Sequence, residues 1–195
     1  MLKTKVILSE VTNLSEARYA AGMGVEHLSF NLDPAGDKYV TADLVKSITE
    51  WVSGVSIIGN IGSRPVKNLQ DYPLNLMQVS NIQLLEQGKD QILYLKVNEE
   101  NINSISSAMA ENSSIVVFFI LSFEEKLIHL HNAKLSKLCE NFNIYLSTSF
   151  NPDSMLEILD SLKPQGIVLY GNKEDRPGNT SYDGIAEVLE QLELD

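Results

Sequence analysis

The sequence is poor in cysteine and in basic residues, and both shortages exclude classes of protein. Cys139 is the single cysteine among 195 residues, which excludes an internal disulfide framework and a zinc site built on several thiolates. Lys and Arg number 15 against 26 Asp and Glu, a formal net charge of -11. This balance argues against nucleic acid as a partner bound over a broad surface.

Long apolar segments are also missing. The longest apolar run, residues 115–121, is far shorter than the roughly 20 residues that a membrane helix needs. No apolar signal core follows the first residues, so we expect a soluble cytoplasmic protein with no membrane partner. One hydrophobic core can serve a chain of this length, and residues 1–195 are expected to form a single domain.

Short β-rich runs alternate with helical patterns along the whole chain. Several runs are continuously apolar, which is typical of parallel strands covered on both faces. The predicted strands are 5–8, 27–32, 55–60, 76–79, 92–97, 114–121, 143–146 and 166–170.

Helix starts can be recognised between the strands. Asn13 and Glu16 have the spacing of a capping box, and Asn151 precedes a first-turn proline. Thr41 precedes a helix expected to bury one face, made of Leu44, Val45, Ile48 and Val52. Only short helices are expected near residues 65–70 and 82–87, where the apolar pattern is weak.

Eight strand–helix units predict an α/β fold, a compact (β/α)8 TIM barrel. Eight units in 195 residues leave about 24 residues each, enough for a strand, a short helix and two tight turns. The same alternation would also produce a doubly wound open sheet. No Gly-x-Gly-x-x-Gly follows the first strand, which weakens the dinucleotide-binding form of that alternative.

In such barrels the active site lies at the C-terminal ends of the strands, and strands seven and eight often hold a phosphate. The residues at these two ends supply hydroxyls, amides and one cation: Ser147, Thr148, Ser149, Gly171, Asn172 and Lys173. They form a candidate phosphate site, although a Ser/Thr-rich turn that only caps the next helix explains the first three equally well.

The histidines and the cysteine give weaker signals. His129 and His131 are two residues apart in a predicted helix, so they point to different faces and are poorly placed to share a metal. Cys139 lies among leucines in the same helix, a setting typical of the core rather than of a nucleophile. We therefore expect no metal and no cofactor.

One stretch near the N-terminus is similar to a known family. Residues 5–17 (KVILSEVTNLSEA) resemble the opening of phosphoribosylanthranilate isomerase, which usually reads Lys-Ile-Cys-Gly-Ile-Thr-Asn and continues into an acidic, alanine-rich helix. Pro34 and residues 38–41 (KYVT) match a proline and an Arg-Tyr-Val/Ile-Ser segment of that family, and Pro177-Gly178 matches a segment near its end. The resemblance implies a barrel of the ribulose-phosphate-binding type.

The resemblance also implies a reaction, the Amadori rearrangement of N-(5'-phosphoribosyl)anthranilate in tryptophan biosynthesis. The family uses a first-strand cysteine as general base and an aspartate at the end of the sixth strand as general acid. Here the cysteine position is Ser9, and the aspartate position falls on Ile120 or Leu121. The arginine of the second loop is replaced by Lys38, and the glycines of the seventh strand by Thr148 and Ser149.

These replacements suggest an isomerase-like barrel that is impaired or repurposed. If activity remains, the nearest substitutes are Glu10 as base and Glu124 as acid, with Lys38 and Lys173 holding the phosphate. The alternative is a non-catalytic barrel that binds a small phosphorylated metabolite or a partner protein. A third hypothesis, another sugar-phosphate isomerase or epimerase using Lys96, Asp33 or Glu99, gains no support from the spacing.

Overall fold

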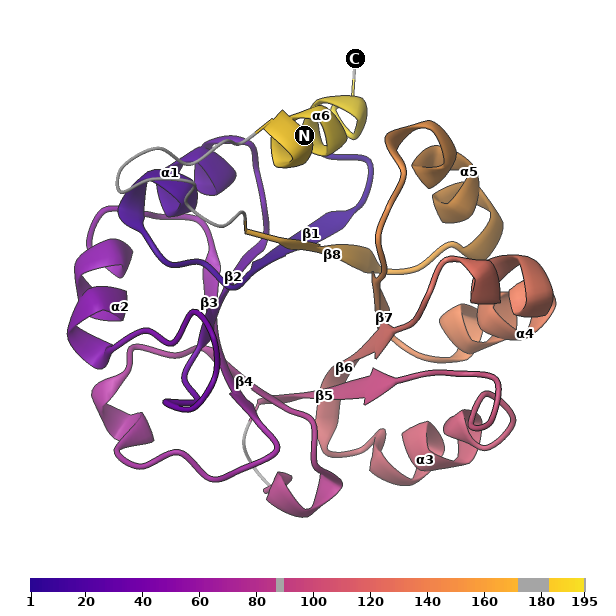
Figure 1. Cartoon of the computed structure of the whole chain (residues 1–195), viewed down its shortest axis with the longest axis horizontal. Coiled ribbons are helices and arrows are strands. Elements are labelled where there is room, and N and C mark those ends of the chain that lie inside the picture. The colour runs from indigo at the N-terminus through magenta and orange to yellow at the C-terminus, as the bar shows by residue number, and fades with distance from the viewer. Residues whose placement is uncertain (87–89, 172–182, 195) are drawn as a thin grey trace.

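The computed structural model describes residues 1–86, 90–171 and 183–194, which form a closed ring of parallel strands surrounded by helices (Figure 1). Neighbouring strands follow the chain order from β1 to β8, and β8 closes the barrel against β1. The strands are β1 (Lys5–Ser9), β2 (His27–Asn31), β3 (Ser56–Gly62), β4 (Leu76–Val79), β5 (Gln91–Lys96), β6 (Val116–Ser122), β7 (Ile144–Ser147) and β8 (Gly166–Tyr170). The predicted (β/α)8 barrel is confirmed, and the strand ends differ from the prediction by at most two residues.

Helices connect most of the strands on the outside of the ring (Figure 1). They are α1 (Leu14–Gly22), α2 (Ala42–Thr49), α3 (Ile105–Asn112), α4 (Lys126–Asn141), α5 (Pro152–Leu162) and α6 (Asp183–Gln191). The two connections on either side of β4 contain single 3-10 turns, η1 (Leu69–Asp71) and η2 (Ile82–Leu84). These turns replace the two short helices expected there, where the sequence lacks an apolar stripe long enough to stabilise an α-helix.

The predicted caps Asn13 and Thr41 are present, and one predicted helix face needs correction. The Asn13 side chain accepts a hydrogen bond from the Glu16 amide at 2.9 Å, and the backbone before α1 is extended, as at other capped helix starts. In α2, Val45 and Ile48 are fully buried, but Leu44 is 36% exposed and the helix ends before Val52. Adjacent helical residues differ by about 100° in direction, so Leu44 and Val45 cannot both face the core.

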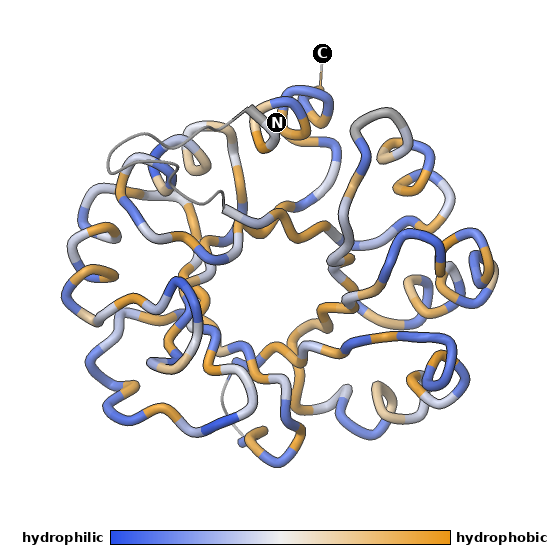
Figure 2. Tube along the Cα trace, in the orientation of Figure 1, coloured by the Kyte–Doolittle hydropathy of each residue, from blue (hydrophilic) through white to orange (hydrophobic). Residues whose placement is uncertain are grey.

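The apolar side chains form two layers, one inside the barrel and one between the strands and the helices. The inner layer is a cluster from six strands: Ile7, Ile58, Ile92, Phe118, Ile120, Tyr145 and Val168. Most apolar neighbours of these residues along the strands belong to the outer layer, although Val117 of β6 is 44% exposed. Most strand positions are therefore covered, in agreement with the orange stretches of the ring in Figure 2.

The helices of the described ranges are all too short or too polar to cross a membrane.

Candidate functional site

The C-terminal ends of the strands form the candidate site, called the mouth below. Side chains alternate along a strand, so residues two positions beyond the inner layer also point inward. The inward residues nearest this end are polar and uncharged: Ser9, Asn31, Asn60, Gln78, Tyr94, Ser122, Ser147 and Tyr170. Hydroxyl and amide groups of this kind can donate and accept hydrogen bonds, as a ligand rich in hydroxyls requires.

Ser9 ends β1 in the position where the resemblance implies a general base. The residue is 4% exposed, and its carbonyl accepts a hydrogen bond from the Gly171 amide at 2.8 Å. A serine hydroxyl without a neighbouring base is a poor proton acceptor at neutral pH.

Strand β6 has apolar side chains at both positions where an acid is implied, just before its last residue, Ser122. Ile120 is 1% exposed and belongs to the inner layer, whereas Leu121 belongs to the outer layer. Of the two positions left open by the sequence, Ile120 is therefore the one that faces the interior. An isoleucine cannot transfer a proton.

Glu10 and Lys38 form an ion pair at the mouth. Lys38 Nζ lies 3.0 Å from Glu10 Oε2 and donates a hydrogen bond to the Gly171 carbonyl at 2.7 Å. These contacts join the ends of β1, β2 and β8. Both residues have positive φ angles, 63° for Glu10 and 59° for Lys38, a conformation that costs a non-glycine residue about 1–2 kcal/mol.

Glu124, the predicted acid, lies on the surface after β6. Its side chain is 76% exposed, and its carboxylate forms an ion pair with Lys126 Nζ at 2.7 Å. The hydrogen bond and the charge of Lys126 lower the pKa of Glu124, which favours the ionised form. A group that has already lost its proton at neutral pH is poorly suited to general acid catalysis.

A hollow of about 370 Å³ lies between the ends of β7 and β8 and the first turn of α6. Ser147, Thr148 and Ser149 line it, so the structure brings together the β7 part of the candidate phosphate site. The hydroxyl of Thr148 is buried and has no hydrogen-bond partner among the described residues. Asn172 and Lys173 lie outside the described residues, as do Pro177 and Gly178.

Gly171 follows β8 at a place where a side chain would be crowded by Glu16. A Cβ atom there would be 2.3 Å from Oε1 of Glu16, a fully buried carboxylate at the start of α1. The glycine therefore serves close packing of β8 against α1 as well as presenting its carbonyl to Lys38.

Two tyrosines in the mouth were missed as site residues. The hydroxyls of Tyr170 and Ser147 lie 2.8 Å apart, within hydrogen-bonding distance. Burial raises the pKa of Tyr170 to about 12, and Tyr94 and Glu10 contribute to the increase. The position of Tyr170, two residues after the buried Val168, was the signal that could have identified it.

The remaining candidates from the sequence do not form a metal site or a nucleophile. His129 is exposed, and burial raises the pKa of the half-buried Cys139 thiol to about 12. The described residues contain no group of three or more His, Cys, Asp or Glu that could hold a metal ion.

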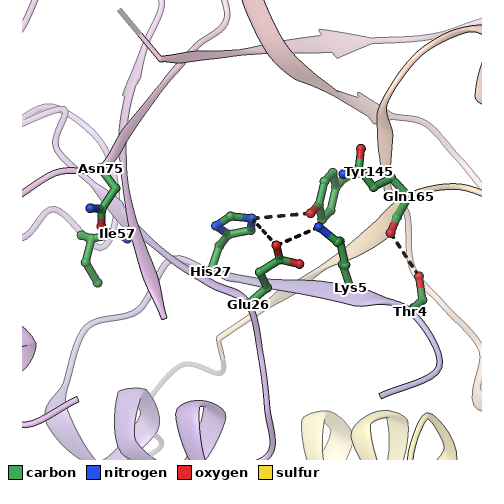
Figure 3. A network of polar contacts seen from close by, with 8 residues as sticks. All are labelled: Thr4, Lys5, Glu26, His27, Ile57, Asn75, Tyr145 and Gln165. Carbon is green, nitrogen blue, oxygen red and sulfur yellow. Dashed lines mark hydrogen bonds and ion pairs between the residues drawn. The ribbon is translucent and has the colours of Figure 1, made fainter. Parts of the chain in front are cut away.

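The opposite end of the barrel contains a cluster of polar residues that the sequence analysis did not identify. It comprises Lys5, Glu26, His27 and Tyr145 and is called the His27 network below. Glu26 lies between Lys5 and His27, with its Oε1 atom 2.9 Å from Lys5 Nζ and 3.8 Å from His27 Nε2 (Figure 3). Tyr145 Oη lies 3.5 Å from the same histidine nitrogen. Barrel enzymes place their chemistry at the other end, so this network is assigned to stability.

Comparisons with known proteins agree with this architecture, although no family model matches the chain. An N-(5'-phosphoribosyl)anthranilate isomerase from Aquifex aeolicus is 20% identical over 198 residues, which cover 96% of this chain and 97% of that protein. The solved phosphoribosylanthranilate isomerase of Thermotoga maritima superposes with a TM-score of 0.75 at 17% identity, covering 97% of this chain and 98% of the other. The chain resembles the phosphoribosylanthranilate isomerases.

The resemblance seen in residues 5–41 therefore extends over nearly the whole chain. A further solved phosphoribosylanthranilate isomerase, with a TM-score of 0.71 at 17% identity, covers 97% of this chain and 98% of its own. It is in complex with reduced 1-(o-carboxyphenylamino)-1-deoxyribulose 5-phosphate. At these identities the solved structures establish the barrel, while the activity has to be argued from the mouth of this chain.

Proposed function

We propose that this chain is a divergent phosphoribosylanthranilate isomerase-like barrel that has lost most of its isomerase activity and binds a small phosphorylated metabolite in its mouth. The observation that carries the proposal is a pair of inward side chains, one at the end of β1 and one in β6, two residues before that strand ends at Ser122. They are the hydroxyl of Ser9 and the hydrocarbon of Ile120, where the resemblance implies a thiol and a carboxyl group.

The loss of both groups has a large expected cost. Opening the ribose ring requires a proton on the ring oxygen. Forming the enol requires removal of a proton from the ribose carbon next to the one that carries the amine. A positioned acid or base usually contributes about 100- to 10,000-fold to such steps. Without either, the rearrangement is expected to slow by several orders of magnitude.

Glu10 and Glu124 compensate poorly for this loss. The carboxylate of Glu10 is paired with the ammonium of Lys38 at 3.0 Å, so it is already engaged by another side chain of the mouth. Glu124 is ionised and paired with Lys126 on the surface. We therefore assign Glu10 to the positioning of Lys38 rather than to proton transfer.

Several features of the mouth favour a phosphorylated ligand. Lys38 provides a cation that is only 14% exposed, and the hollow between β7 and β8 is lined by Thr148, whose hydroxyl is buried without a partner among the described residues. Asn31, Asn60 and Gln78 lie on the facing part of the ring. The Asn31 amide donates to the Asp37 carbonyl, and Asn60 Oδ1 accepts from the Gly62 amide, so a sugar hydroxyl would add to or replace these bonds. In this proposal the phosphate competes with the Glu10 carboxylate for Lys38.

Complementation tests the loss of isomerase activity. A bacterial strain lacking phosphoribosylanthranilate isomerase is transformed with this chain, with an active isomerase, or with an empty vector. We expect growth without tryptophan only for the active isomerase. Growth supported by this chain would overturn the proposed loss of activity, and failure of Glu10→Gln to grow would then identify Glu10 as the base.

Thermal denaturation with ribose 5-phosphate tests the binding proposal. We expect the sugar phosphate to raise the melting temperature of the native chain and to have a much smaller effect on Lys38→Met. Lys163→Met is the matched control, because Lys163 also has a positive φ angle (50°) but lies at the opposite end of the barrel. No shift in the native chain would contradict metabolite binding and favour a partner-binding barrel. An equal shift in both variants would contradict the proposed role of Lys38 in holding the phosphate.

A further inference from the structure

The two tyrosines of the mouth lie beside the two positions that have lost their proton-transfer groups. In the strand register, Tyr170 of β8 is opposite Ser9 of β1, and Tyr94 of β5 is opposite Ile120 of β6. Each altered position therefore has a phenol as its neighbour in the sheet. Ser9 and Ile120 therefore each lie beside an aromatic residue of the adjacent strand.

The two phenols approach each other across the interior of the barrel. Strands β5 and β8 are separated by β6 and β7, so residues on them can meet only through the space enclosed by the ring. Ile92 and Val168, two residues earlier on the same strands, belong to the inner layer, and Tyr94 packs against that layer. Tyr94 also acts directly on the phenol of Tyr170, whose pKa it raises.

Ser147 fixes the position of this pair. Its hydroxyl is 2 % exposed and lies 2.8 Å from that of Tyr170, so the phenol is held above the end of β7. Tyr94 lies above the inner layer beside Ile120. Together the rings cover the part of the mouth over β6 and β7 and leave the part over β2 to β4, where Asn31, Asn60 and Gln78 point inward.

We infer that Tyr94 and Tyr170 determine ligand size in this barrel, admitting a small sugar phosphate and excluding one that also has an aromatic acid attached. This inference rests on the proposed binding of a phosphorylated metabolite. A sugar phosphate needs an anion site and hydroxyl partners, which the hollow, Lys38 and the amides provide. An added carboxyphenyl group needs further volume, which the two rings occupy.

Isothermal titration of the full chain with two probes tests the inference. The small probe is ribose 5-phosphate, and the large probe is reduced 1-(o-carboxyphenylamino)-1-deoxyribulose 5-phosphate, the compound bound in a solved relative. We expect the native chain to bind the small probe at least about tenfold more tightly than the large one.

Replacing Tyr170, which is 41% exposed and so tolerant of truncation, by Ala should tighten binding of the large probe about tenfold. Tyr170 also lines the hollow, so the test compares the two affinities, and their ratio should shift at least about tenfold toward the large probe.

Phenylalanine variants separate ring volume from hydrogen bonding. Tyr170→Phe and Tyr94→Phe keep the rings and their packing, so both should fold and still reject the large probe. Equal affinity of the native chain for both probes, or tightening by the Phe variants as large as that by Tyr170→Ala, would overturn the size filter while leaving metabolite binding intact. If folded native and variant proteins bind neither probe, the proposed function fails and this inference fails with it.

Discussion

The two ends of the barrel use polar residues in opposite ways. In the His27 network, Lys5, Glu26, His27 and Tyr145 contact one another, and the histidine ring packs against Phe118 and Tyr145 with centroids 5.6 and 6.0 Å away. Gly166 allows this packing, because a Cβ there would lie 2.4 Å from both the Lys5 carbonyl and the Tyr145 ring. Polar groups at this end serve a closely packed structure.

The mouth instead contains residues whose backbone conformation lowers stability. Glu10 and Lys38 have left-handed backbones although neither follows a helix, whereas Lys163, at the end of α5, is in a position where helices commonly end this way. The hydroxyl of Thr148 is buried without a partner among the described residues, but so are His27 Nδ1 and Gln165 Oε1 at the opposite end, so unmet hydrogen bonding does not distinguish the two ends. The left-handed backbones of Glu10 and Lys38 remain the difference, and strain of this kind often persists where a ligand binds. This difference is consistent with the binding role proposed for the mouth.

The largest expected effect is at the His27 end. Gly166→Ala places a methyl group against backbone and an aromatic ring that cannot move independently, so we expect the free energy of unfolding to fall by about 3 kcal/mol. Urea denaturation followed by circular dichroism measures it.

Gly184→Ala is the matched control for this substitution. Gly184 lies in the first turn of α6, and a Cβ there would meet nothing within 4 Å. Because alanine is the better helix former, we expect no loss of stability and a gain of up to about 1 kcal/mol. Equal losses in both variants would contradict the close packing described around Gly166.

The second prediction concerns the pH dependence of stability at the same end. Burial lowers the pKa of His27, with Glu26 opposing and Lys5 reinforcing the shift. The unfolded chain then binds a proton more readily than the folded chain, so stability is lost as pH falls below about 6.5 and is constant above it. We expect His27→Gln to show a shallower decrease between about pH 7.5 and 5.5 than the native chain.

His129→Gln is the control for this titration, because His129 is exposed and should leave the slope unchanged. Denaturation curves at several pH values provide the measurement. An unchanged slope in His27→Gln would show that the network does not govern the acid sensitivity of the barrel.

The barrel could be predicted from the sequence because the patterns that specify its strands and helices are local. Alternating strand and helix patterns, with Asn13 and Thr41 as caps, determine the order of elements, and parallel order follows from strands that are apolar on both faces. Leu44 was wrongly assigned to the buried face of α2, because the hydrophobicity of a residue does not show in which direction the helix places its side chain.

The site was predicted less completely because its contacts join distant strands. Lys38 and Gly171 are 133 positions apart, and no local pattern indicates their hydrogen bond. Tyr94 and Tyr170 meet only through the curvature of the closed barrel, so each looks like an ordinary strand residue in the sequence. The roles predicted for Ser149 and Glu10 in a ligand complex remain predictions.

The third prediction compares lysines with similar backbones at the two ends. Lys163→Gly relieves about 1–2 kcal/mol of left-handed strain, and the entropy of glycine in the unfolded chain offsets about 0.4–1 kcal/mol of that. We expect a net gain in stability of about 0.5 kcal/mol. Lys38→Gly gains the same relief but loses the contacts of the ammonium with Glu10 and Gly171, so we expect a net loss of about 1 kcal/mol. Stabilisation by both variants, measured by urea denaturation, would show that the Lys38 contacts contribute nothing.

The smallest expected effect concerns Glu124, which the sequence predicted as a general acid. Its carboxylate is exposed and interacts with Lys126. It follows β6, two strands away from Tyr170 and three from Ser9 around the ring, so Glu124→Gln should change neither the melting temperature nor the binding of ribose 5-phosphate. Lys38→Met provides the opposing result in the same titration, because it removes the cation of the mouth. A loss of binding in Glu124→Gln comparable to that in Lys38→Met would mean that the loop after β6 closes over the ligand. The mouth would then extend beyond the inward ring of side chains, and Glu124 would have to be reconsidered as part of it.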